Sequence, residues 1–235
     1  MHLIINIVVF HGSPRKGNTY HATKIFMDEL VKHSDINFTE FFMPADFPKF
    51  CIGCALCLGG KHEKCPNAAF VAPILQAILQ ADALIFATPH YGGCLMPATM
   101  KNLLDHLDFL VLNINPHEHI FDKKAFVITT GAGSITAAGA IKKAVRHWGI
   151  NRVYACGLRL FAVKWENMPA KRQTRLEKTL RCFAKKFLYT KKRRPYFSTI
   201  LYYYMTKFVI KKYVGSGNFP YENWESKGYF KHRPF

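Results

Sequence analysis

Five short apolar segments alternate with helix-length segments along most of the chain, and this alternation constrains the fold more than any other feature. The apolar segments are rich in β-branched and aromatic residues, as strands buried on both faces are; they span residues 3–10, 37–42, 83–88, 124–130 and 152–161. Segments with apolar residues at helical spacing lie between and after them; they span residues 19–33, 73–80, 97–112, 136–148 and 170–189. Five strand–helix units in series predict a doubly wound α/β fold, with a five-stranded parallel sheet covered by helices on both faces.

Charge divides the chain into two unequal parts. Residues 1–170 hold 16 Lys and Arg against 12 Asp and Glu, whereas residues 171–235 hold 17 against 3. We therefore expect a balanced body over residues 1–170, followed over residues 171–235 by the last core helix and a basic, aromatic C-terminal helical extension. The apolar run at the start has no basic residues before it and leads directly into Gly12-Ser13-Pro14, so it predicts a strand rather than a signal peptide. A cytoplasmic protein is expected.

The loop after the first apolar segment has the composition of an anion site. In parallel sheets, ligands bind beyond the carboxyl ends of the strands. Here residues 11–19 leave a buried strand and open a helix, so free backbone amides and the positive helix end converge. Glycines allow close approach, and hydroxyl and guanidinium groups add donors; these residues are Gly12, Gly17, Ser13, Thr19 and Arg15. The order differs from that of triphosphate and dinucleotide loops, which favours a monophosphate. The alternative is an ordinary turn in which Asn18 or Thr19 caps the helix.

This loop also carries a resemblance to a known family. The string Gly-Ser-Pro-Arg-Lys-Gly-Asn-Thr after a first strand resembles the phosphate loop of the flavodoxin-like NADPH-dependent FMN reductase family. The resemblance extends to residues 81–91 and 100–105, although His106 stands where relatives commonly have Arg. It implies a flavodoxin-like sheet with strand order 2-1-3-4-5.

The resemblance also implies where FMN binds. The phosphate would be held by Ser13, Arg15, Gly17, Asn18 and Thr19. The isoalloxazine ring would lie along two further loops, at Pro89, His90, Tyr91, Gly92, Thr130, Gly131 and Gly133. No side chain is expected to be catalytic, because flavin N5 carries the chemistry.

A second constellation gathers four cysteines in a short segment. Cys51, Cys54 and Cys57 form two successive Cys-x-x-Cys steps, and Cys65 follows after a glycine-containing return. This spacing resembles the compact motif of the iron-sulfur flavoproteins, a branch of the same family, and implies a [4Fe–4S] cluster. A Cys₄ zinc site and bare thiols remain open alternatives.

The resemblance implies an enzyme, an NAD(P)H-dependent FMN reductase-type oxidoreductase. Electrons would pass from NAD(P)H, a transient co-substrate, or from a reduced redox protein to a small acceptor such as a quinone, a flavin or a redox partner. The alternative function is a non-catalytic electron carrier that docks redox proteins such as ferredoxin through its basic extension.

The aromatic segment at residues 196–205 is apolar on nearly every side of a helix, so something must cover it. Packing against a second subunit, giving a homodimer or a larger homo-oligomer, is the preferred explanation. Adsorption to an anionic membrane surface comes second, and nonspecific binding of nucleic acid third.

Overall fold

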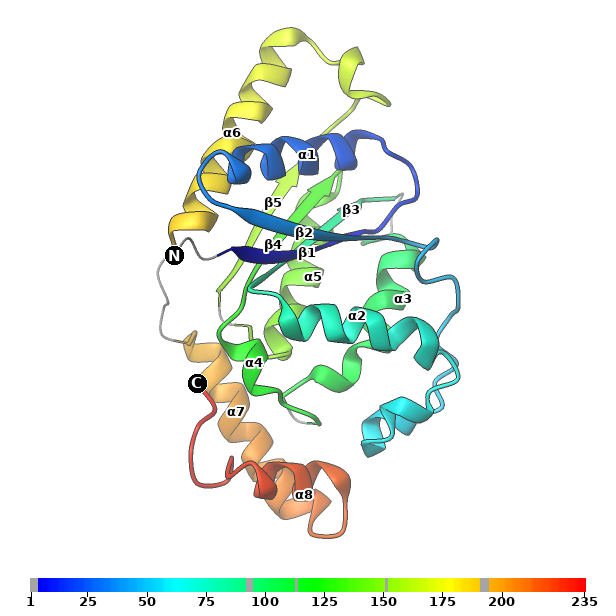
Figure 1. Cartoon of the computed structure of the whole chain (residues 1–235), viewed down its shortest axis with the longest axis vertical. Coiled ribbons are helices and arrows are strands. Elements are labelled where there is room, and N and C mark those ends of the chain that lie inside the picture. The colour runs from blue at the N-terminus through cyan, green and yellow to red at the C-terminus, as the bar shows by residue number, and fades with distance from the viewer. Residues whose placement is uncertain (1–3, 92–94, 113, 151, 191–194) are drawn as a thin grey trace.

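The computed structural model describes residues 4–91, 95–112, 114–150, 152–190 and 195–235. Five parallel strands form one sheet in the order β2-β1-β3-β4-β5, which confirms the expected doubly wound, flavodoxin-like fold. The strands are β1 (Ile5–His11), β2 (Ile36–Phe42), β3 (Ala83–Pro89), β4 (Lys124–Thr130) and β5 (Arg152–Leu158). The sheet lies in the middle of the molecule with helices on both faces (Figure 1).

Two apolar cores form because side chains alternate along each buried strand. In β1, Ile7 and Val9 pack against one layer of helices, while Val8 and Phe10 pack against the other. The first layer contains α1 (Asn18–Val31) and α6 (Ala170–Tyr189). The second contains α2 (Ala68–Gln80), α3 (Ala98–His106) and α5 (Ser134–His147). The remaining short elements are the helix α4 (Glu118–Phe121) and the 3-10 turns Leu56–Gly59, His62–Lys64, Asp108–Leu110 and Trp165–Asn167.

Three boundaries differ from the sequence prediction by three residues or more. Helix α2 begins at Ala68 rather than at Pro73, so the proline lies inside the helix, where it lacks the amide that would donate to the preceding turn. Helix α3 ends at His106, and a separate 3-10 turn, Asp108–Leu110, follows it. Strand β5 ends at Leu158, three residues before the predicted end, so residues 159–161 are free to form a loop.

An ionic contact joins the two helices of the first layer. The carboxylate of Glu29, on α1, is 6% exposed and lies 3.3 Å from Arg181 and 3.4 Å from Lys185, both on α6. Burial alone would raise the pKa of Glu29, but hydrogen bonds from His33, Lys32, Arg181 and Lys185 lower it to about 2. The carboxylate therefore stays charged and fixes α6 against the body.

The C-terminal extension folds back on its own chain at the end of the molecule opposite α1 (Figure 1). Helix α7 (Phe197–Val209) continues into a π-helical turn, Ile210–Val214, and α8 (Phe219–Ser226) follows. Tyr203 and Trp224 stack with ring centroids 5.5 Å apart, and the Trp224 indole donates to the Leu112 carbonyl at 3.0 Å. One side of the aromatic segment is thus covered by the chain itself. No helix among the described residues is long and apolar enough to cross a membrane.

Candidate functional site

The first loop is fixed at its beginning by contacts to β3 and α3. The Gly12 amide donates to the Ala87 carbonyl at 2.8 Å, and the Thr99 hydroxyl donates to the Gly12 carbonyl at 2.8 Å. A Cβ on Gly12 would lie 2.4 Å from Oγ1 of Thr88, which is fully buried. Only glycine therefore fits where the chain turns out of β1.

The N-terminus of α1 is open toward this loop. Its cap residue, Gly17, contributes no side-chain hydrogen bond, and the first helical bond runs from the His21 amide to the Gly17 carbonyl at 3.0 Å. The amides of residues 18–20 precede that bond and have no partner within the helix. Together with the helix dipole, these amides make the turn favourable for an anion.

Arg15 connects the first loop to the loop after β3. Its guanidinium donates to the Tyr91 hydroxyl at 2.9 Å and lies 5.9 Å from the centre of the Tyr91 ring. Burial would raise the pKa of Tyr91, but hydrogen bonding to Arg15 and Ser13 and the charge of Arg15 lower it. A guanidinium and a tyrosine thus meet at the mouth of the site.

The loop after β4 lies against His90. The His90 amide donates to the Thr130 carbonyl at 2.7 Å. Gly131 has a φ of +121°, and a Cβ on Gly133 would lie 2.2 Å from Nε2 of His90. The two glycines therefore make room for the imidazole. A buried hydrogen bond of 2.6 Å between the hydroxyls of Thr19 and Thr130 ties this loop to α1.

A cavity of about 320 Å³ lies between these loops. Ten of the twelve residues predicted to bind the cofactor line it: Ser13, Arg15, Gly17, Asn18, Thr19, Pro89, His90, Tyr91, Thr130 and Gly131. Gly133 packs on His90 instead, and Gly92 lies outside the described residues.

Sequence reasoning missed one wall of this cavity, formed by Leu160, Ala162 and Val163. These residues follow β5, and the Asn18 amide group donates to the Ala162 carbonyl at 2.9 Å. The mostly apolar sequence up to Phe161, interrupted only by Arg159 after Arg152, predicted a longer strand. No signal in the sequence indicated this wall, because the exposure of Val163, 90%, is known only from the structure.

The cavity fits a phosphorylated, hydroxyl-bearing ligand such as FMN. Oδ1 of Asn18 is buried and has no hydrogen-bond partner among the residues that the structure describes, and such atoms in native proteins usually have one. The other amide atom of Asn18, Nδ2, already donates to Ala162, so Oδ1 is left to accept from a ligand hydroxyl. The open helix end and Arg15 supply donors for a phosphate.

The start of the cysteine segment is held by two buried asparagine side chains. The Asn102 side chain accepts from the Cys51 amide at 3.0 Å and donates to the Lys49 carbonyl at 2.8 Å. The Asn67 amide group donates to the Phe50 carbonyl at 3.0 Å and lies 2.9 Å from Nε2 of His106. His106, the residue that departs from the family pattern, is therefore part of the base of this segment.

The four cysteines do not form a ligand set in this arrangement. Cys51 and Cys54 are exposed, and Cys57 and Cys65 are half-buried. Burial, followed by the neighbouring Cys51 and Cys65, raises the pKa of the Cys57 thiol. Nowhere in the part of the chain that the structure describes do three or more Cys, His, Asp or Glu side chains converge as metal ligands would. The four thiols as they stand therefore do not provide a preformed site for a cluster.

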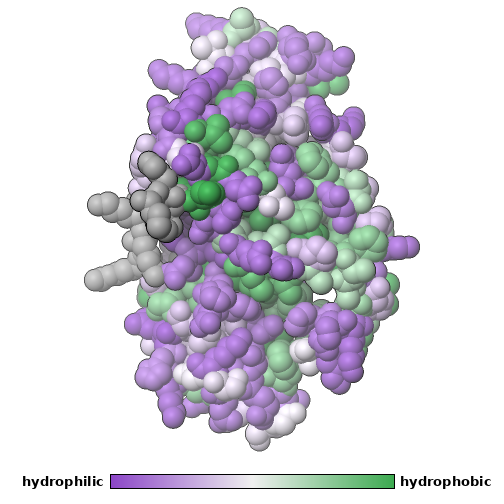
Figure 2. Space-filling view, in the orientation of Figure 1, coloured by the Kyte–Doolittle hydropathy of each residue, from purple (hydrophilic) through white to green (hydrophobic). Residues whose placement is uncertain are grey.

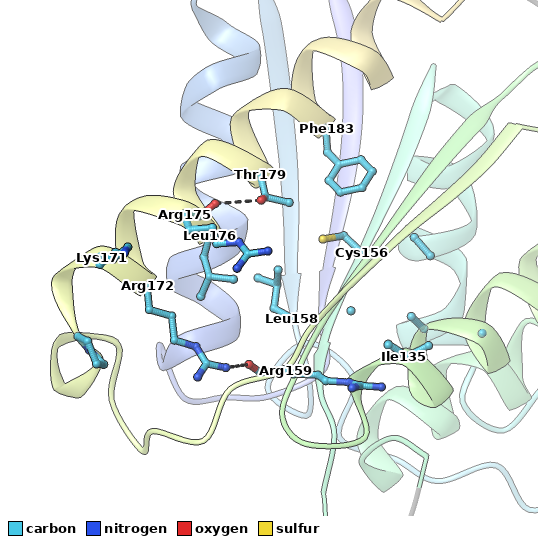
Figure 3. Close-up of a pocket in the computed structure, with 15 residues that line it drawn as sticks. Ile135, Cys156, Leu158, Arg159, Lys171, Arg172, Arg175, Leu176, Thr179 and Phe183 are labelled. Atoms are coloured by element: carbon cyan, nitrogen blue, oxygen red, sulfur yellow. Dashed lines mark hydrogen bonds between the residues drawn. The ribbon is translucent and has the colours of Figure 1, made fainter.

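A larger hollow of about 1230 Å³ lies away from these loops, along the outer edge of β5 between α5 and α6 (Figure 3). Its floor is apolar and includes Cys156, Leu158 and Phe183. Four cations border it: Arg159, Lys171, Arg172 and Arg175. The Arg172 guanidinium donates to the Arg159 carbonyl at 2.7 Å. Ten of the cofactor residues predicted from the sequence line the smaller cavity, which is therefore the candidate cofactor site.

Comparison with known families agrees with this geometry. Residues 5–164 match the family described as NADPH-dependent FMN reductase. The chain belongs to this family. It is 29% identical over 102 residues to an iron-sulfur flavoprotein from Archaeoglobus fulgidus, a match covering 43% of this chain and 48% of the relative. It is 34% identical over 104 residues to an iron-sulfur flavoprotein from Methanocaldococcus jannaschii, a match covering 43% of this chain and 51% of the relative. The chain thus spans about half the length of these curated relatives.

Solved structures share the fold. An NAD(P)H:quinone oxidoreductase from Methanothermobacter marburgensis superimposes with a TM-score of 0.61 at 14% identity, over 82% of this chain and 100% of that one. An FMN-dependent NADH-azoreductase from Bacillus anthracis, solved with FMN, superimposes with a TM-score of 0.58 at 12% identity, over 79% of this chain and 100% of that one. At these identities the likeness concerns the fold alone.

Proposed function

We propose that the protein is an FMN-dependent oxidoreductase whose cofactor lies in the cavity between the three loops. The observation that carries this proposal is that ten residues from three separate loops line one cavity beside an open helix N-terminus. When bound, FMN supplies the redox chemistry, taking up a hydride from NAD(P)H and passing electrons to a small acceptor.

The residues of the chain position the cofactor in this proposal. Arg15, Ser13 and the amides at the start of α1 bind the phosphate, and the side-chain Oδ1 of Asn18 accepts from a hydroxyl of the sugar chain. The Thr19–Thr130 hydrogen bond holds two of the loops at a fixed separation. No side chain is assigned a catalytic role.

Anaerobic titration with FMN, followed by addition of NADH or NADPH, tests the proposal. Arg15→Gln removes charge-assisted hydrogen bonds and should weaken FMN binding about 10- to 100-fold. Lys16→Gln is the matched control, because Lys16 belongs to the same loop but points its amine toward the rings of Tyr20 and Phe42. The proposal fails if wild-type protein takes up no FMN, if both variants weaken binding equally, or if neither nucleotide bleaches the bound flavin.

The hollow beside β5 supports the second function, an electron carrier. Its four cations form no ion pair among the described residues, and Lys171 and Arg172 add positive charge to the N-terminal end of α6. An acidic redox protein such as ferredoxin is complementary to this surface. Under this alternative, ferredoxin reduces the flavin where nicotinamide does not, at rates that fall with rising salt.

Three narrower expectations stay predictions. A [4Fe–4S] cluster at Cys51, Cys54, Cys57 and Cys65 is supported by the names of the distant relatives and is tested by iron, zinc and sulfide assays on anaerobically purified protein. A homo-oligomer and a cytoplasmic location are the other two predictions. Helix α2 contains no charged residue, and the surface over it appears as an apolar area in Figure 2. This composition is suited to contact with a second subunit.

A further inference from the structure

Helix α7 presents a continuous apolar stripe to solvent. Phe197 is 79% exposed, Met205 58% and Phe208 57%. Positions spaced by three, four or seven residues share one face of a helix. The stripe consists of Phe197, Leu201, Tyr204, Met205 and Phe208.

The opposite face of α7 is buried within the chain, which fixes the stripe outward. Thr199, Tyr203 and Thr206 are each at most 5% exposed. The Tyr203 hydroxyl donates to the Tyr229 carbonyl at 2.6 Å, and His147 of α5 stacks on Tyr202 with ring centroids 4.9 Å apart. The helix therefore cannot rotate to hide the stripe without breaking this core.

Positive charge borders the stripe. No acidic residue occurs between residues 195 and 221, whereas Lys207, Lys211 and Lys212 lie on α7 and its π-helical continuation. The amine of Lys212 lies 5.3 Å from the rings of Phe208 and of Tyr213. A second copy docked on this face would place these lysines against its own, which is unfavourable. Apolar and aromatic side chains edged by lysines match an anionic bilayer surface, where rings enter the interface and amines reach lipid phosphates.

We propose that α7 docks this protein on the surface of anionic membranes. The stripe enters the interfacial region, and the lysines pair with lipid headgroups. Binding stays at the interface, because no described helix could span the bilayer.

Helix α7 and the cofactor cavity lie at opposite edges of the sheet. Helix α7 packs near the amino ends of the strands, since its cluster includes Phe121, just before β4, and Leu112. The cavity lies at the carboxyl ends of the same strands. Each strand has seven residues, so the two edges are about 23 Å apart. The cavity therefore lies about one strand length away from the edge of the sheet against which α7 packs.

Flotation of the full chain with lipid vesicles tests the proposal. Vesicles of phosphatidylcholine mixed with phosphatidylglycerol should retain the protein, and vesicles of phosphatidylcholine alone should retain far less. Replacing Leu201 and Phe208 by Ser should lower the partition coefficient about 100-fold. Replacing Lys211 and Lys212 by Gln should lower it about 25-fold, at about fivefold per lysine.

Matched controls separate docking from general charge and hydrophobicity. Val31→Ser removes an apolar side chain that is 49% exposed on α1. Lys171→Gln with Lys178→Gln removes two charges from α6. Neither control should reduce vesicle binding by as much as the corresponding substitutions at residues 201, 208, 211 and 212. Near-ultraviolet circular dichroism verifies that each variant is folded. Equal retention of all variants, or equal binding to neutral vesicles, overturns the proposal. So does a lipid-free dimer, seen by analytical ultracentrifugation, that Phe208→Ser converts to monomer, because the face would then join two copies.

Discussion

Substituting the two glycines of the first loop separates its role in folding from its role in ligand binding. In Gly12→Ala, the new Cβ would lie 2.4 Å from Oγ1 of Thr88, 2.8 Å from its Cβ and 3.0 Å from Cβ of Met100. Ordinary carbon contacts are about 3.5–4.0 Å, and both neighbours are fully buried and cannot retreat to solvent. Overpacking of this kind costs about 1–3 kcal/mol. At about 2–4 °C per kcal/mol for a chain of this size, a cost near 2 kcal/mol lowers Tm by about 4–8 °C.

Gly17→Ala is the matched substitution in the same loop. No atom of the described residues lies within 4 Å of the Cβ position, and Gly17 has a φ of −89°, which alanine adopts without strain. Its stability should stay within about 0.5 kcal/mol of wild type. Because Gly17 lines the cavity, the methyl group occupies ligand space, and FMN binding should weaken about tenfold, or about 1.4 kcal/mol.

Thermal unfolding followed by circular dichroism and FMN titration by fluorescence measure the two effects. The reasoning is refuted if Gly12→Ala unfolds at the wild-type temperature, because the packing around Thr88 would then be looser than the structure indicates. It is also refuted if Gly17→Ala loses stability while binding FMN normally.

Three further predictions concern contacts away from the first loop. The pKa of Glu29 is about 2 in the folded protein against an ordinary value of 4.5, so its contribution is complete above pH 4.5 and is lost as the pH falls toward 2. Because solvent screens the exposed cations that pair with it, urea unfolding should show a loss of about 1 kcal/mol that Glu29→Gln abolishes. Thr130→Val leaves the buried Thr19 hydroxyl without its partner and should lower the free energy of unfolding by about 1–3 kcal/mol, whereas a stability equal to wild type would contradict the buried hydrogen bond. His106→Ala removes a buried partner at the base of the cysteine segment and should speed alkylation of Cys51; an unchanged rate would show that the segment is held without it.

The sequence by itself determined the order and type of the main elements. Strand and helix periodicities are local properties of the chain, so the five parallel strands and α6 (Ala170–Tyr189) follow from them. Predicted cofactor residues also met in one cavity, because parallel strands bring the loops at their carboxyl ends to one edge of the sheet.

Contacts between distant segments determined the features of the structure that the sequence did not predict. The wall at residues 160–163 depends on where β5 stops and on the bond from Asn18 to Ala162, neither of which periodicity encodes. The role of His106 depends on Asn67, which comes to it from another part of the chain. The aromatic extension has apolar residues on nearly every side, so only tertiary packing of Tyr203 and Trp224 determined which face is buried and which face remains for a partner.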